Sequence, residues 1–141
     1  MNRKKVIYSE LKDKSKAQEA FNAGKLAGVM ARYGYELTPV RNDAQGADFI
    51  AYRVDEDPLL IQLKGRPEIR DDYRGKEIWM AFPTTDPDSH VMYMVPHDTL
   101  MEIWQEGNPT LTRSASWKKG KYNGTPQWLY KALADYALGE D

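Results

Sequence analysis

Asp48, Gln62 and Lys64 are the side chains of this 141-residue chain whose types and spacing are best suited to chemistry. A carboxylate and an amide oxygen are ligands that a hard divalent cation accepts, and the main-chain carbonyl of Leu63 offers a further one. A lysine beside such an ion can stabilise negative charge that develops on a phosphate. The pattern therefore indicates metal-assisted cleavage of a phosphodiester bond.

Two predicted strands must bring these side chains together. The residues from Phe49 to Arg53 and from Leu59 to Lys64 are rich in apolar and aromatic side chains. The stretch from Val54 to Pro58 between them has the composition of a turn. The sequence therefore predicts a β-hairpin.

The expected pairing of the two strands follows from that turn. With a loop from Val54 to Pro58, Asp48 lies opposite Lys64 and Ile50 lies opposite Gln62. Alternate residues share a face, so the polar groups converge on one side and the other side is a continuous apolar strip suited to a core. The alternative is an ordinary amphipathic hairpin that exposes the same polar side chains to solvent.

This arrangement resembles the metal site of the PD-(D/E)xK nuclease superfamily, in the segments Gly46-Ala47-Asp48-Phe49-Ile50-Ala51 and Gln62-Leu63-Lys64. The resemblance covers Gly46 to Arg66 and extends more loosely through Pro96. Gln62 stands where the usual ligand is a carboxylate, a variant that also occurs among type IV restriction enzymes acting on modified DNA. The resemblance implies a single-domain restriction-endonuclease-like core of the α/β class, a bound Mg²⁺ or Mn²⁺ ion, and hydrolysis of DNA.

The resemblance also implies an acidic residue on the helix before the first strand of the hairpin. The sequence predicts one helix over about residues 16–33, with an apolar stripe formed by Leu26, Val29, Met30 and Tyr33. Glu19 falls on that stripe, and it is the candidate for a further metal ligand. The alternative is that Glu19 only interacts with the helix dipole and with neighbouring lysines.

Basic and aromatic residues are concentrated towards the end of the chain, although the formal net charge is −1. The segment from Gly107 to Ala134 contains no acidic residue. Basic groups neutralise phosphates and aromatic rings stack on bases, so this segment is a candidate surface for DNA. The alternative is a surface loop whose aromatic rings cover the edge of the core. The candidate residues are Arg113, Trp117, Lys118, Lys119, Lys121 and Tyr122.

A second basic cluster consists of Arg66, Arg70 and Arg74, which follow the candidate catalytic lysine. We expect a loop there, because a proline interrupts the segment and no helical stripe is sustained. The arginines would then lie near the scissile phosphate. The alternative is a salt-bridged surface loop, which is the preferred interpretation for Asp71 and Asp72.

Composition limits the other chemistry that the chain could perform. The length and the 41% hydrophobic content predict one domain over residues 1–141. The absence of cysteine excludes disulfides and thiol catalysis, and the two histidines are too few for a histidine metal cage. His97 lies at a predicted strand-to-helix junction, where we expect a structural role. No apolar run is long enough to span a membrane and no signal peptide is recognised, so we expect a cytoplasmic location without membrane contact.

The remaining elements predict an α/β fold with a central mixed β-sheet flanked by helices. Strands are expected at Tyr35 to Thr38, Lys76 to Phe82 and Val91 to Val95. Helices are expected from Thr99 to about Gln105 and from Pro126 onwards.

Three functions are consistent with the sequence. The first is a Mg²⁺- or Mn²⁺-dependent DNA endonuclease. The second is a nuclease-like module that binds DNA or a protein without cutting, because Gln62 weakens its metal site. The third is a structure-selective junction resolvase that acts as a homodimer.

Overall fold

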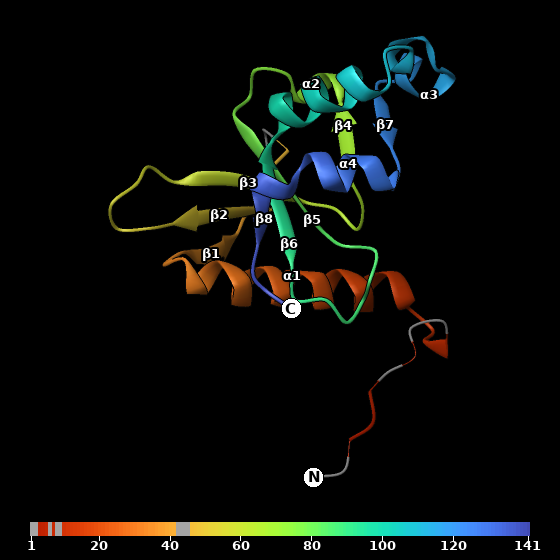
Figure 1. The fold of residues 1–141 in the computed structure, drawn as a ribbon. Helices are drawn as coiled ribbons and strands as arrows, with labels where there is room; N and C mark the ends of the chain where they lie inside the picture. The colour runs from red at the N-terminus through yellow and green to blue at the C-terminus, as the bar shows by residue number, and fades with distance from the viewer. Residues whose placement is uncertain (1–2, 6, 8–9, 42–45) are drawn as a thin grey trace.

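The computed structural model describes residues 3–5, 7, 10–41 and 46–141, and it shows an α/β fold built on a six-stranded sheet (Figure 1). Neighbouring strands β3 and β5 run parallel and the other neighbours run antiparallel, so the sheet is mixed as predicted. The strands follow the order β1 (Glu36–Pro39), β2 (Phe49–Tyr52), β3 (Leu59–Leu63), β5 (Ile78–Pro83), β6 (Met92–Pro96) and β8 (Ala137–Leu138).

Helix α1 (Lys14–Arg32) covers one face of this sheet. The stripe residues Leu26, Val29 and Met30 are buried there against Ala51 of β2 and Ile61 of β3. The apolar strip predicted for the hairpin is therefore the face that packs on α1. Tyr33, which was predicted to belong to the same stripe, is 42% exposed because the helix ends at the preceding residue.

Helices α2 (His97–Gly107) and α4 (Gln127–Ala132) cover the opposite face. Side chains alternate along β5, so Met80 and Phe82 pack with Trp104 of α2 and Leu129 of α4, whereas Ala81 packs with α1. Burial on both faces explains why β5 is a nearly continuous apolar run.

A second, two-stranded sheet lies beside α2 and consists of β4 (Glu68–Arg70) and β7 (Lys121–Asn123). The prediction of an irregular loop for this part of the chain was therefore wrong at β4. Its pairing partner is remote in sequence, and three residues are too few to give a recognisable alternation. Shorter elements surround this ribbon or follow α4: η2 (Asp71–Tyr73), η3 (Leu111–Arg113), α3 (Ala115–Lys118) and η4 (Ala134–Tyr136).

The predicted hairpin exists, but its register differs by two residues. Phe49 pairs with Ile61 and Ile50 pairs with Leu60, whereas the sequence predicted partners two positions further along β3. A shift of two residues keeps every side chain on its predicted face, because the period of a strand is two. The connection is longer than predicted, since the ladder closes at the pair Ala51 and Leu59. Among the described residues, none of the helices combines the length and the hydropathy of a membrane span.

Candidate functional site

The predicted metal-binding and catalytic residues line one cleft. The cleft has a volume of about 680 Å³ and lies between the first half of α1 and the ends of β2 and β3. Glu19 comes from α1 and Asp48 precedes β2. Gln62 and Leu63 are the last two residues of β3, and Lys64 follows them. Its complete lining is Lys16, Glu19, Ala20, Asn22, Ala23, Asp48, Phe49, Gln62, Leu63, Lys64 and Gly65.

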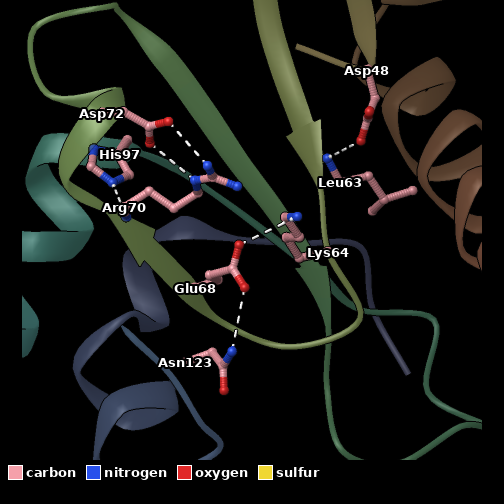
Figure 2. A network of polar contacts seen from close by, with 8 residues as sticks. All are labelled: Asp48, Leu63, Lys64, Glu68, Arg70, Asp72, His97 and Asn123. Carbon is pink, nitrogen blue, oxygen red and sulfur yellow. Dashed lines mark hydrogen bonds and ion pairs between the residues drawn. The ribbon is translucent and has the colours of Figure 1, made fainter. Parts of the chain in front are cut away.

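Asp48 is held in place by the backbone of the neighbouring strand. Its main-chain N–H donates to the Ile61 carbonyl at 2.7 Å, and its Oδ2 accepts a hydrogen bond from the Leu63 N–H at 3.0 Å (Figure 2). These two bonds fix the orientation of a half-buried carboxylate that lines the cleft. The Leu63 N–H is thus engaged by Asp48, and the role of the Leu63 carbonyl as a metal ligand stays a prediction.

The oxygen donors of the cleft have the chemical character that a hard cation requires. Asp48 and Glu19 supply carboxylates, and Gln62, with only 8% of its surface exposed, supplies a buried amide. Glu19 is exposed at the rim of the cleft. Among the described residues, no three Asp, Glu, His or Cys side chains lie close enough together to hold a metal ion. The residues therefore fit Mg²⁺ or Mn²⁺ in donor type, with two carboxylates and one amide.

Lys64 contacts a residue that the sequence did not reveal. Its Nζ lies 3.3 Å from Oε2 of Glu68 in β4, and 9% of the Glu68 side chain is exposed (Figure 2). The other oxygen, Oε1, accepts a hydrogen bond from Nδ2 of Asn123 in β7 at 3.3 Å. Within the described part of the chain, Oε2 has the ion pair but no hydrogen bond. Lys64 thus joins the cleft to the β4–β7 ribbon.

Neither sequence periodicity nor composition pointed to Glu68. The residue lies in a segment of mixed charge that resembles an exposed loop, and acidic residues are rarely buried without a partner. The one available signal is its position four residues after Lys64. That spacing brings side chains together in a helix, and here no helix forms.

His97 connects two elements of the fold through hydrogen bonds. The buried ring accepts a hydrogen bond at Nε2 from the Arg70 N–H at 2.9 Å, so its Nδ1 carries the proton and donates to Oδ1 of Asp98 at 2.9 Å. Oδ2 of Asp98 accepts in turn from the Gly75 N–H at 3.0 Å. Burial lowers the pKa of His97, and the hydrogen bond and the charge of Asp98 oppose that effect. This neutral ring connects α2 to β4.

The two basic clusters predicted separately belong to one structural unit. β4 pairs with β7, and the Asp71 N–H donates to the Gly120 carbonyl at 2.9 Å. Two of the three arginines in the cluster of Arg66, Arg70 and Arg74 are in ion pairs: Arg70 with Asp72 at 3.0 Å and Arg74 with Asp71 at 2.9 Å. The hydrogen bond to Arg70 lowers the pKa of Asp72.

The predicted basic residues that are exposed are Arg66, Arg74, Arg113, Lys118, Lys119 and Lys121, and of these Arg74 is in the ion pair with Asp71. The candidate stacking residues are less accessible, because Trp117 and Tyr122 are half-buried against the core. The Arg74 guanidinium lies 5.6 Å from the Trp117 ring centre, and Tyr122 packs edge-on to Trp104. The unit therefore offers charge to a partner more readily than it offers flat aromatic surfaces.

Comparison of the chain with protein-family models, with curated proteins and with solved structures finds no match. The function is therefore inferred from the geometry of the cleft and of the basic unit.

Proposed function

We propose that this protein is a metal-dependent DNA endonuclease that acts in the cytoplasm. The observation that carries the proposal is the common cleft of Glu19, Asp48, Gln62 and Lys64. The sequence predicted these four residues from a hairpin and a helix that are separated along the chain, and a chance set of surface residues would have no reason to share one cavity.

Each residue has a role that its position supports. Asp48 and Gln62, with Glu19 from the opposite wall, would hold Mg²⁺ or Mn²⁺. The bound cation would lower the pKa of a water molecule and neutralise charge on the phosphate oxygens. Lys64 would stabilise the negative charge that builds up on the phosphate during attack. In the structure its ammonium group is paired with Glu68 of β4.

Cleavage assays on plasmid, linear and branched DNA test the proposal. Cutting is expected with Mg²⁺ or Mn²⁺ and not with EDTA, and activity confined to branched DNA would favour the resolvase. Asp48→Asn is expected to abolish cutting. Asp57→Asn makes the same change at an exposed carboxylate of the same hairpin and is expected to cut like the parent. Full activity of Asp48→Asn would remove the cleft from the mechanism.

The exposed lysines of the ribbon and α3 are the proposed contact with the DNA backbone. Replacing Lys118, Lys119 and Lys121 with alanine is expected to lower the slope of log K against log salt by up to about three. Trp117→Ala removes no charge and is expected to leave the slope unchanged. Fluorescence anisotropy at several salt concentrations measures both, and an unchanged slope in the triple variant would contradict this contact.

The second candidate, a binding module without cleavage, is favoured by two observations. Gln62 supplies no charge to a metal, and Lys64 is already engaged by Glu68. Calorimetric titration with Mn²⁺ discriminates the candidates. If the protein is a binding module, Gln62→Glu is expected to bind metal more tightly than the parent. If it is an enzyme adapted to the amide, Gln62→Glu is expected to bind metal as tightly as the parent and to cleave DNA at the same or a lower rate. If neither the parent nor Gln62→Glu binds Mn²⁺, the proposed metal site is contradicted.

A further inference from the structure

A second, smaller cleft continues the first one along α1. It has a volume of about 190 Å³, and Asn22 and Gly65 line both clefts. Its other walls come from α1, including Gln18 and Lys25, and from the segment after β5, including Thr85. The two clefts therefore lie side by side, with Asn22 and Gly65 at their junction.

Lys25 is the unusual residue of this second cleft. Its Nζ is buried and has no hydrogen-bond partner in the described part of the chain, and the ring centre of Phe21 lies 5.0 Å away. A buried ammonium group without an acceptor is costly, and a ring face compensates for only part of the lost hydration. The carboxylate of Asp141 acts on Lys25 only through space, since it accepts hydrogen bonds from Ser89 and the His90 N–H.

The two clefts differ in charge. Two carboxylates, of Glu19 and Asp48, and two lysines, Lys16 and Lys64, line the first cleft, whereas Lys25 is the one charged residue among the described residues that line the second. Lys25, the amides of Gln18 and Asn22, and the hydroxyl of Thr85 can all donate hydrogen bonds. The first cleft thus offers carboxylates to a cation, and the second, with one positive charge and no negative one among its described residues, is suited to an anion.

We propose that the second cleft binds a DNA phosphate that neighbours the phosphate attacked in the first cleft. The inference rests on the proposed function, because it takes the ligand of both clefts to be one DNA strand. Lys25 has a flexible four-carbon stem, so its ammonium group turns from the Phe21 ring to the phosphate when DNA binds. Asn22, at the junction of the clefts, donates to the same strand.

The test compares Lys25→Met with Lys14→Met, in which the same change is made at an exposed lysine of the same helix. Methionine keeps most of the apolar stem and removes the charge. Binding of a fluorescein-labelled DNA oligonucleotide is measured by anisotropy in EDTA at several salt concentrations, so no cleavage or metal enters the result. Lys25→Met is expected to bind about tenfold more weakly and to reduce the salt slope by about one, and Lys14→Met to bind like the parent.

Lys25→Met is also expected to raise the melting temperature in the absence of DNA, because it removes a buried charge that has no acceptor. This readout shows that weaker binding in the variant does not come from unfolding. Equal affinity and slope in Lys25→Met and the parent would overturn the phosphate site.

Failure of this site and failure of the nuclease proposal are separable. Metal-dependent cutting by the parent together with unchanged binding in Lys25→Met would overturn only the phosphate site. Weaker binding in Lys25→Met without any cutting by the parent would support the phosphate site and overturn the nuclease. Absence of DNA binding by the parent would overturn both, and a parent that binds only an RNA oligonucleotide would overturn DNA as the ligand.

Discussion

The ion pair between Lys64 and Glu68 predicts an asymmetric response to mutation. In Lys64→Met the Glu68 carboxylate loses its cation while 9% of its side chain is exposed, so it cannot turn to water. In Glu68→Gln the ammonium group is left without its anion, but 29% of the Lys64 side chain is exposed and the group can move into solvent. Gln at position 68 can also still accept the hydrogen bond from Asn123.

The expected loss in the free energy of unfolding lies between two limits. Exposed ion pairs contribute about 0.2–1 kcal/mol, and removal of one partner from a fully buried pair costs about 3–5 kcal/mol. For this partly buried pair we expect Lys64→Met to lower the free energy of unfolding by about 2 kcal/mol and Glu68→Gln to lower it by about 1 kcal/mol. The double variant is expected to be more stable than Lys64→Met alone, because no charge is left unpaired.

Urea unfolding of the parent, the two single variants and the double variant measures the coupling between the residues. For a domain of this size, a loss of about 2 kcal/mol lowers the melting temperature by about 4–8 °C. Additive effects within about 0.5 kcal/mol would show that the pair is not coupled and would refute this reasoning. The double variant is also the proper background for testing Lys64 in catalysis, since it separates loss of the ammonium group from loss of stability.

Two further predictions follow from the fold. Burial lowers the pKa of His97, so the unfolded chain takes up a proton first and stability falls as the pH drops below the ordinary histidine pKa of about 6.5. Urea unfolding from pH 8 to 5 is expected to show this loss of stability in the parent and in His90→Gln but not in His97→Gln. An equal loss of stability in His97→Gln would contradict the assignment to His97. Gly46 and Gly75 both have positive φ angles, but only at Gly46 would a Cβ meet the Tyr73 ring, at 2.6 Å. Gly46→Ala is therefore expected to cost about 1–3 kcal/mol more than Gly75→Ala, and equal melting temperatures would exclude the steric contribution.

The sequence predicted the faces of the hairpin better than its register. Alternation of apolar and polar residues determines which side of a strand faces the core, and the predicted core residues of the hairpin, Phe49, Ala51 and Ile61, all pack on the side of α1. Alternation does not distinguish registers that differ by two residues, so only the turn could decide between them. The turn was taken as Val54 to Pro58, whereas the ladder closes further back, at Ala51.

Helix α1 was predictable because its apolar stripe is long and periodic, and Glu19 on its first half lines the predicted cleft. The β4–β7 ribbon was not predictable, because each strand has three residues and the partner lies far along the chain. The contact between Lys64 and Glu68 was missed for the same reason, since the ribbon is what positions Glu68. Local patterns thus gave the catalytic candidates, and long-range pairing determined what surrounds them.

The long separation between the strands of the ribbon has a consequence for the order of folding. Asn123 bonds to Glu68 across 55 residues, and closing so long a loop costs entropy before the contact forms. The hairpin of β2 and β3 closes a much shorter loop. We therefore expect the walls of the cleft to assemble early and the basic ribbon to join late, so that the backbone amides of β7 exchange with solvent faster than those of β5. The surface proposed to hold DNA would then be the last part of the molecule to form and the first to open.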